Sequence, residues 1–261
     1  MALACACQSR GRGRRVLVGA GPGAVWVSLI EQEQPLLDAL RPRDRAALLA
    51  LGVPRGYRTG EVLLSENATT SYVVALLGGW ATVSVSTERG SRLILALRGA
   101  GELVGELAAM DRRPRSATVT ALGDVDAVVI PGDRFRGFLA ASPAVSALAF
   151  RQLGSRLRSA DGERRSLASE NVLQRLAARL LELAVRTGRR AADGSVTVDL
   201  PLPQHDLAAS VGSTREAVAK ALRLLRERGI VRTATRQIAV VELEPLRLLA
   251  GEGSEPGRPT V

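Results

Sequence analysis

Residues 105–119 combine the residue types that hold a sugar phosphate. Gly105 has no Cβ, so a ligand can approach its backbone closely. The residues directly after it predict one helical turn, whose free N–H groups attract an anion. Arg115 offers a forked, permanently charged donor and Ser116 offers a hydroxyl, whereas Glu106 would accept a hydrogen bond from a ligand hydroxyl. The stretch therefore predicts a pocket for a ligand that carries both a phosphate and a hydroxyl.

Residues 204–228 have the pattern of two short helices joined by a tight turn, a helix-turn-helix. Gly212 supplies the turn, and Thr214 can cap the second helix through its hydroxyl. One face of that helix is apolar. The opposite face carries the charged residues Arg215, Glu216, Lys220 and Arg223. Arginine and lysine pair with guanine acceptors, and glutamate accepts from cytosine. The segment predicts a DNA-reading element, and an ordinary solvated helical hairpin is the alternative interpretation.

A β-hairpin is predicted over residues 230–241, directly after the second helix, and it carries Arg236 at its turn. Arg236 would contact a DNA phosphate there. Basic residues outnumber acidic ones over 204–236, and the whole chain has a formal net charge of +10. A basic excess that clusters on one element favours a polyanionic partner, here double-stranded DNA, over an arginine-rich composition without functional meaning.

The composition limits the class of protein. The chain has 261 residues, 46% of them hydrophobic, so it can bury a core in one large or two modest domains. Its cysteines, Cys5 and Cys7, cannot form a disulfide framework, and its single histidine, His205, leaves too few ligands for zinc or haem. We expect no metal site, no tightly bound cofactor and a reducing, cytoplasmic location. No apolar run is long enough to span a bilayer, so we expect no membrane contact.

The middle of the chain reads as a β-domain over residues 34–142. A short helix is predicted at 35–50, and short apolar strands separated by glycines follow it. The predicted strands are 62–64, 72–77, 81–85, 93–97, 117–120 and 127–130. Regular short strands with glycine breaks favour an antiparallel β-roll or jelly roll, and with the helices that follow they predict an α+β fold.

Residues 143–170 predict a dimerisation helix. Its apolar positions alternate in steps of three and four residues, as in a heptad seam that pairs with a second copy. The seam consists of Phe150, Leu153, Leu157, Ala160, Arg164 and Leu167. A break at Asp161-Gly162 is one alternative, and a helix packed only on its own domain is another. A second helix over 171–187 begins a DNA-binding domain at 171–245, and a tail at 246–261 opens with a short helix.

The first residues contain two patterns that could mislead. Residues 1–33 are rich in glycine and arginine without periodicity, so we expect a disordered N-terminal extension. Within it, residues 16–24 resemble a dinucleotide fingerprint, but no helix or βαβ unit is predicted after them. A nucleotide-dependent oxidoreductase that uses residues 16–24 is the alternative from another functional class. Arginines before an apolar stretch also resemble a secretion signal, which glycines interrupt.

Together these motifs resemble the Crp/Fnr family of bacterial transcription regulators, over about residues 34–245. The resemblance rests on the cassette from Gly105 to Thr118 and on the helix-turn-helix from Gly212 to Lys220. It implies an N-terminal β-roll, a long dimerisation helix and a C-terminal winged helix-turn-helix. It also implies a homodimer that binds DNA and is not an enzyme, with RNA polymerase as a candidate partner.

The resemblance assigns roles to individual residues. Gly105 and Leu107 would lie against a cyclic nucleotide, and Glu106 would accept from its ribose hydroxyl. The cyclic phosphate would be bound by Arg115, Ser116 and the backbone of Ala117. In the DNA domain, Arg215, Glu216 and Lys220 would face the bases, with Thr214, Arg223 and Arg236 beside them.

The sequence also departs from the family pattern. Members that bind cAMP place a Thr-Ser pair against the purine, and the aligned positions here are Ala160 and Asp161. Ala160 has no polar side chain, and a charged Asp161 is an acceptor only. The DNA helix has Lys220 where an arginine is usual, and lysine cannot make the same planar, two-pronged contact. Control by cAMP or a similar cyclic nucleotide is the expected regulation, and a ligand-independent regulator with a vestigial pocket is the alternative.

Overall fold

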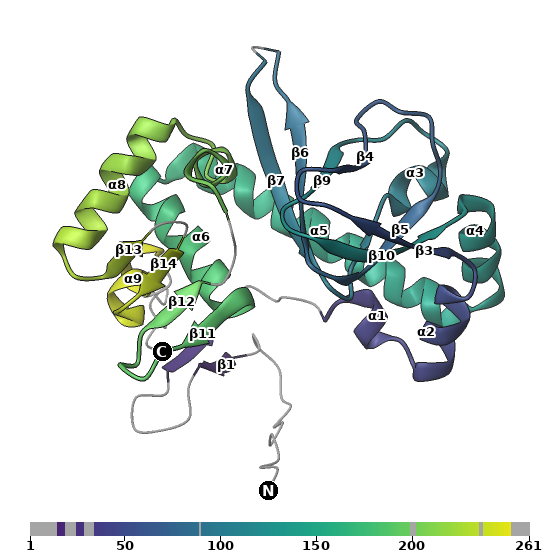
Figure 1. The fold of residues 1–261 in the computed structure, drawn as a ribbon, viewed down its shortest axis with the longest axis horizontal. Helices are drawn as coiled ribbons and strands as arrows, with labels where there is room; N and C mark the ends of the chain where they lie inside the picture. Colours follow the sequence, from purple (N-terminus) through teal and green to yellow (C-terminus); the bar gives the residue numbers. More distant parts are fainter. Residues whose placement is uncertain are drawn as a thin grey trace, which may run out of the picture. The chain divides into compact units, whose positions relative to one another are not determined.

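The computed structural model describes residues 15–18, 25–28, 34–88, 90–198, 202–234 and 237–251, in two units of residues 1–32 and 33–261 (Figure 1). The first unit contains strands β1 (Arg15–Val18) and β2 (Val25–Ser28), which pair antiparallel. The expectation of an extension without regular structure is therefore wrong for these two segments. The glycines of the dinucleotide-like pattern lie outside the described residues, and a strand rather than a helix follows them.

The β-roll consists of two four-stranded antiparallel sheets (Figure 1). The first has the order β3 (Val53–Tyr57), β10 (Val125–Ile130), β5 (Val73–Gly78), β8 (Leu103–Val104). The second has the order β4 (Val62–Leu64), β9 (Thr118–Ala121), β6 (Trp80–Ser86), β7 (Arg92–Gly99). The predicted antiparallel β-roll and the α+β class are confirmed. Strands β3 and β8 were not predicted.

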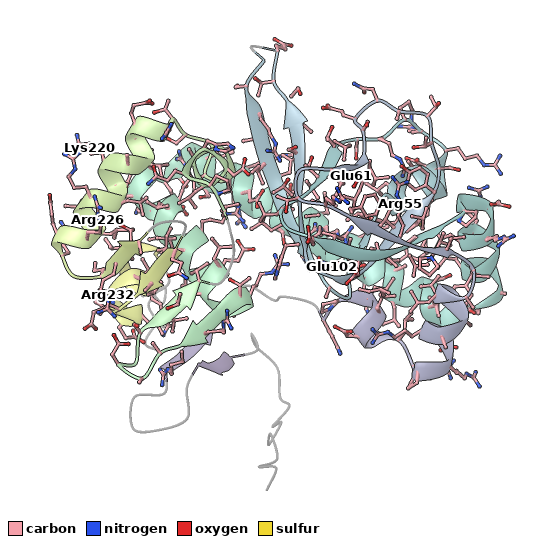
Figure 2. All side chains as sticks on the ribbon, in the orientation of Figure 1. Arg55, Glu61, Glu102, Lys220, Arg226 and Arg232 are labelled. Atoms are coloured by element: carbon pink, nitrogen blue, oxygen red, sulfur yellow. The ribbon has the colours of Figure 1, made fainter. Side chains whose placement is uncertain are left out.

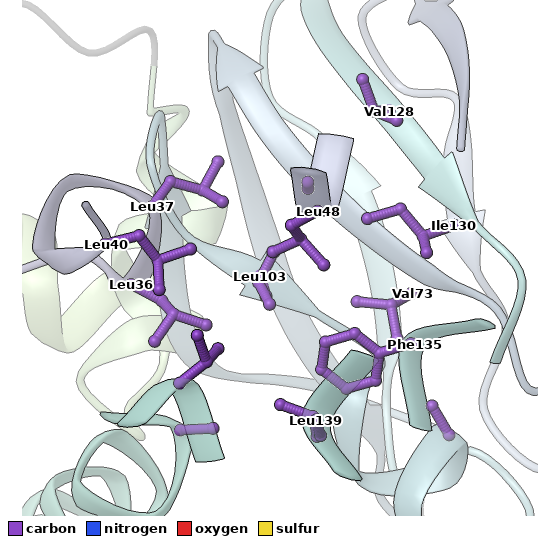
Figure 3. Close-up of a cluster of buried hydrophobic side chains, with 14 residues drawn as sticks. Leu36, Leu37, Leu40, Leu48, Val73, Leu103, Val128, Ile130, Phe135 and Leu139 are labelled. Atoms are coloured by element: carbon purple, nitrogen blue, oxygen red, sulfur yellow. The ribbon is translucent and has the colours of Figure 1, made fainter. Parts of the chain in front are cut away.

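Strand β5 lies between two hydrophobic cores. Its successive side chains point to opposite faces of the sheet, as they do in any β-strand. Val73 and Ala75 belong to the core under the helices, with Leu48 and Phe135, which Figure 3 shows. Val74 and Leu76 belong to the second core, with residues of both sheets. Strand β5 is consequently buried from Val73 to Leu76.

The helices that cover the first core differ from the prediction. The single helix expected at 35–50 is wrong, because α1 (Leu36–Ala39) and α2 (Pro42–Leu49) are separate. Pro42 forces the preceding residue, Arg41, into an extended conformation, so the first helix cannot continue through it. Helix α3 (Glu106–Asp111) forms the predicted turn of the cassette. Helix α4 (Gly132–Ala141) was not predicted.

Helix α5 (Pro143–Ser169) runs for 27 residues without a break at Asp161-Gly162. Its packing therefore outweighs the cost of about 1 kcal/mol that a glycine brings to a helix interior. Three apolar residues of the predicted seam are exposed in the protomer, namely Phe150, Leu157 and Leu167. Helix α6 (Val172–Thr187) follows, and a capping box between Asn171 and Gln174 fixes its start.

The C-terminal part is a winged helix-turn-helix. Helices α7 (Gln204–Ser210) and α8 (Arg215–Glu227) precede strands β13 (Val231–Ala234) and β14 (Gln237–Val240). Strands β11 (Gly188–Arg190) and β12 (Val196–Val198), which were not predicted, complete a sheet of order β11-β12-β14-β13. Helix α9 (Leu243–Leu249) ends the described chain. Among the described residues, no helix is both long and apolar enough to cross a membrane.

Candidate functional site

Arg115 lies inside the β-roll, with only 2% of its surface exposed. Its guanidinium donates from Nη1 to the Gly105 carbonyl at 2.7 Å and from Nη2 to the Tyr72 carbonyl at 2.6 Å. Nε donates to Thr70 Oγ1 at 3.1 Å, and the guanidinium carbon lies 4.9 Å from the centre of the Tyr72 ring. The loop before β5 and the start of α3 therefore fix the orientation of this cation.

Gly105 makes room for Arg115. Its φ of +83° is in the left-handed region, which favours glycine. A Cβ at this position would lie 2.5 Å from Nη1 of Arg115 and 2.8 Å from a methyl group of Leu64. The sequence predicts that Gly105 lets a ligand approach the backbone. The structure gives a different reason for the glycine, because the close neighbour is the arginine side chain itself.

Glu106 forms an ion pair with Arg156 of helix α5, and Arg156 Nη1 lies 2.5 Å from Glu106 Oε1. Arg156 Nη2 also donates to the Leu103 carbonyl at 2.9 Å. The carboxylate is thus held between the cassette of residues 105–119 and helix α5. Arg156 was not predicted as a site residue. The only available signal was its place on α5, one helical turn before Ala160.

Arg115 has no carboxylate partner within ion-pairing distance among the described residues. Burial lowers the pKa of its guanidinium, and the nearby Tyr72 and Glu106 act in the opposite direction. Arginine nevertheless stays charged in proteins. A buried charge without a counter-ion is costly, so the surroundings of Arg115 favour the approach of an anion.

The remaining cassette residues lie in different surroundings. Ala117 is buried, Ser116 is exposed and Leu107 is 47% exposed. On α5, Ala160 is half-buried, and Asp161 is exposed and paired with Arg164 at 3.3 Å. The structure therefore brings Gly105, Glu106 and Arg115 together, whereas Asp161 bonds to its own helix.

Helix α8 presents its charged side chains to solvent. Thr214 caps the helix as predicted, accepting a hydrogen bond from the Ala217 amide at 3.2 Å. The apolar stripe of α8 is buried. The residues predicted to face DNA are exposed, namely Arg215, Glu216, Lys220 and Arg223. Within the described part of the chain, Arg215, Lys220 and Arg223 make no hydrogen bond or ion pair. Arg236 lies outside the described residues.

Side chains of α8 and of the adjoining sheet extend this basic surface. Figure 2 labels Lys220 and Arg226 on α8 and Arg232 on the neighbouring strand β13. Arg226 Nη1 donates to Thr233 Oγ1 at 3.2 Å, which ties the helix to the wing. Arg232 pairs with Asp193 in the β11–β12 turn. Arginine and lysine on a helix and an adjoining wing are the residue types that contact the base edges and phosphates of DNA.

Arginines of α6 hold the turn of the helix-turn-helix in place. Arg175 Nε donates to the Val211 carbonyl at 2.9 Å, and Arg179 Nη2 donates to the Ser210 carbonyl at 3.1 Å. Arg179 also pairs with Glu182 at 2.6 Å and with Glu163 of α5 at 3.4 Å. The turn is thereby connected to the end of the long helix. Sequence reasoning missed these contacts, because they join residues that share no motif.

Arg186 and Arg92 form ion pairs that join the β-roll to the C-terminal part. Arg186 of α6 donates to Glu102 Oε2 at 2.9 Å and to the Leu97 carbonyl at 3.1 Å, and it lies over the Trp80 ring. Arg92 of β7 pairs with Asp206 of α7 at 3.0 Å. Elsewhere in the described chain, no group of three or more His, Cys, Asp and Glu side chains could hold a metal ion.

Two family models match the chain. The cyclic nucleotide-binding domain matches residues 54–142, and the Crp-like helix-turn-helix domain matches residues 174–249. A CRP-like cAMP-activated global transcriptional regulator of Mycobacterium tuberculosis is 28% identical over 211 residues, which cover 81% of this chain and 94% of the relative. A cyclic AMP receptor protein of Thermus thermophilus is 29% identical over 83% of this chain and 96% of that protein.

Solved structures show the same fold. A CRP/FNR-family transcriptional regulator of Thermus thermophilus has a TM-score of 0.62 at 26% identity, covering 76% of this chain and 98% of its own. The structure of FixK2 from Bradyrhizobium japonicum has a TM-score of 0.68 at 22% identity, covering 76% of this chain and 96% of its own. The likeness to FixK2 supports the fold alone.

Proposed function

Because the chain belongs to the Crp/Fnr family of transcription regulators, we propose that a cyclic nucleotide controls its binding to DNA. The domains we propose are a β-roll at 34–142, a dimerisation helix at 143–170 and a DNA-binding domain at 171–245, with an extension at 1–33 and a tail at 246–261. The protein acts as a homodimer in the cytoplasm, without a catalytic role, and RNA polymerase is a candidate partner.

Arg115 is the observation that carries this proposal. It is a buried cation, oriented by three acceptors, without a carboxylate partner in the described chain. A cyclic phosphate carries one negative charge and would serve as the counter-ion of Arg115. Arg115 uses one N–H of each nitrogen in these bonds, so two of its five donors remain for the phosphate. Ser116 and the Ala117 backbone complete the anion contacts.

Glu106 supports a ligand with a ribose. Arg156 occupies Oε1 of Glu106 and leaves Oε2 without a partner among the described residues. The free oxygen would accept the ribose hydroxyl, and Gly105 and Leu107 would lie along the sugar. Because Arg156 belongs to α5, a nucleotide that changes the Glu106–Arg156 pair would act directly on the dimerisation helix. Ala160 and Asp161 on the same helix are the residues that we propose to lie toward the base.

Homodimer formation is supported by the exposed seam of α5. Phe150, Leu157 and Leu167 are 64%, 62% and 49% exposed in the protomer. Large apolar side chains in a heptad pattern pair with a second copy of the same helix. A symmetric dimer would present two α8 helices to half-sites about 34 Å apart, with Arg215, Glu216 and Lys220 toward the bases. Thr214, Arg223 and Arg236 would contact the flanking backbone.

A second candidate is a regulator that needs no ligand. The observation that favours it is that Arg115 and Glu106 both have partners within the chain, namely two carbonyls for Arg115 and Arg156 for Glu106. In that case the cassette would be a structural cluster that joins the loop before β5 to α3 and α5. Both candidates bind DNA, and they differ in whether a nucleotide binds the β-roll.

Titration calorimetry with cAMP and cGMP separates the two candidates. We expect the wild type to bind one nucleotide per protomer and Arg115→Lys to bind it far more weakly, because lysine cannot make the forked contact. Arg113→Ala is the matched control, since Arg113 is an exposed arginine of the same loop. Absence of binding to either nucleotide, with the wild type folded and able to bind DNA, would favour the ligand-independent regulator.

A further inference from the structure

One arginine of the hairpin of β6 and β7 forms an ion pair with the first helix of the helix-turn-helix. Arg92 Nη1 donates to Asp206 Oδ1 at 3.0 Å. Its Nη2 donates to Thr82 Oγ1 at 2.6 Å, and its Nε donates to Ser84 Oγ at 3.1 Å. Thr82 and Ser84 are buried residues of β6, so the guanidinium is oriented before it meets Asp206. We call the Arg92–Asp206 pair the clasp.

Asp206 is a buried acid at the interface that the clasp closes. It lies in the first turn of α7 with only 5% of its surface exposed, and the His205 imidazole lies 3.4 Å away. Helix α7 packs against strand β7. The second link between the two parts, Arg186 with Glu102, lies on α6 and the loop before β8. Of these two links, the clasp is therefore the one that acts directly on a helix of the helix-turn-helix.

The clasp lies on the wall of a cleft of about 840 Å³ between the β-roll and the DNA-binding domain. Thr82, Arg92 and Thr120 line one side of the cleft. Arg215, the first residue of α8, lines the opposite side together with Gln237 of the wing. Clefts of roughly 300–1,000 Å³ hold small molecules, so this one has no room for a DNA duplex.

This geometry conflicts with base reading. The N-terminal end of a recognition helix has to enter the major groove, which is about 12 Å wide between its phosphate backbones. In the clasped arrangement the exposed side chain of Arg215 lines a cleft whose opposite wall belongs to the β-roll. A duplex that approached Arg215 from the cleft side would therefore meet the β-roll. Lys220, further along α8, is exposed, so contacts with phosphate remain available to the clasped protein.

We infer that the clasp is an autoinhibitory contact, which holds the regulator in a closed state that binds DNA without reading its bases. Sequence-specific binding then requires the clasp to open and Arg215 to leave the cleft. The inference rests on the proposed DNA-binding function but on none of the cassette residues. When only a fraction of the protein is open, the apparent affinity for the operator falls by that same fraction.

Arg92→Ala tests the inference, with operator affinity measured by fluorescence anisotropy and without nucleotide. The operator is first selected from a random duplex pool with the wild-type protein. We expect Arg92→Ala to bind the operator about tenfold more tightly, because losing a charged hydrogen bond favours the open state. An increase in affinity is diagnostic, because the loss of a positive charge by itself weakens binding to DNA.

Two further variants control for charge and folding. Arg43→Ala removes an arginine from the surface of α2, outside the cleft, and we expect equal or slightly weaker binding. Arg92→Asp should open the protein, and Arg92→Asp with Asp206→Arg should restore the closed state at unchanged net charge. Hydrogen exchange of the α7 and β7 amides follows the clasp without DNA, and it should be faster in Arg92→Ala and slow again in the swapped pair.

The outcomes separate the clasp from the proposed function. If Arg92→Ala binds the operator with equal or lower affinity than the wild type, or exchanges α7 amides at the same rate, the clasp is not autoinhibitory. If the wild type and all variants fail to bind any duplex, the proposed DNA-binding function is wrong. Tighter binding by Arg92→Ala that the swapped pair reverses would support the clasp, whether or not a nucleotide binds the β-roll.

Discussion

The chain uses arginine in two opposite ways, in the sensor cassette and on α8. Arg115 is 2% exposed and all three of its nitrogens have acceptors, whereas Arg215 is exposed and makes no hydrogen bond or ion pair in the described chain. An oriented cation that is already out of water can select one small anion. A cation left in solvent can adapt to a polymer of phosphates and base edges. Under the proposed function, the cassette would select its ligand by a fixed shape, and α8 would bind DNA through contacts that form on binding.

The largest expected effect is a difference between the two arginines in the free energy of unfolding. Arg115→Ala leaves the Tyr72 carbonyl unpaired in the interior, at a cost of about 1–3 kcal/mol, whereas the Gly105 carbonyl keeps the Ala109 amide as a partner at 3.3 Å. The substitution also removes most of a buried side chain, which costs about 2 kcal/mol or more. We therefore expect the free energy of unfolding to fall by roughly 3 kcal/mol or more, measured by urea denaturation. Arg215→Ala is the matched variant, and its effect should stay within about 0.5 kcal/mol. Equal losses in the two variants would remove the distinction between the two arginines.

The second expected effect is on the affinity and base preference of DNA binding. Arg215→Ala should weaken operator binding by about 1–3 kcal/mol and relax the preference at one base position. Binding to a panel of single-base operator variants measures both quantities. Arg228→Ala, at the C-terminal end of α8, removes the same charge and should lower affinity evenly across the panel. If Arg215→Ala also lowers affinity evenly, Arg215 contacts phosphate and not a base.

The smallest effect concerns a carboxylate that has cationic partners on both sides. Burial tends to raise the pKa of Glu182, but Arg179 and Arg186 outweigh it and hold the pKa below its ordinary value. A carboxyl with a lowered pKa stabilises the fold above its unfolded pKa of about 4.3, and this stability is lost as the pH falls below that value.

Glu182→Gln should therefore make the unfolding free energy less dependent on pH between about 5 and 3. The expected difference from the wild type is below about 1 kcal/mol, as for ion pairs that remain partly solvated. Urea denaturation at several pH values measures it. An unchanged pH profile would show that the ion pairs of Glu182 with Arg179 and Arg186 do not contribute to stability.

The sequence predicted the elements whose signals are local. The cap at Thr214 and the turn at Gly212 require only neighbouring residues, and α5 follows from its own periodicity. Strand β3 was missed because it contains Pro54 and Gly56, which are unusual in a strand and tolerated here at the edge of a sheet. Helix α4 was missed because it begins after a proline, at Gly132, within a segment that reads as a loop.

The charged contacts of the site could not be read from the sequence. The motif correctly groups Gly105, Glu106 and Arg115, but their partners come from distant segments. Arg156 lies 50 residues from Glu106 along the chain, and the Arg92–Asp206 pair spans 114 residues. No spacing rule connects residues so far apart, and each pair depends on how β7, α5 and α7 pack. The motif thus predicts which residues belong to the candidate site. The tertiary structure determines which of them already have a hydrogen-bond or ion-pair partner.

Strand β5 gives the sensor an unequal rigidity. Because its alternate residues belong to two different cores, the strand can separate from its neighbours only when both cores open together. Such a segment exchanges its amide hydrogens last and moves least in the native state. Tyr72, whose carbonyl orients Arg115, directly precedes this strand. The carbonyl that orients Arg115 is therefore held in a fixed position, and we expect the proposed ligand to shift α3 and α5 rather than this strand.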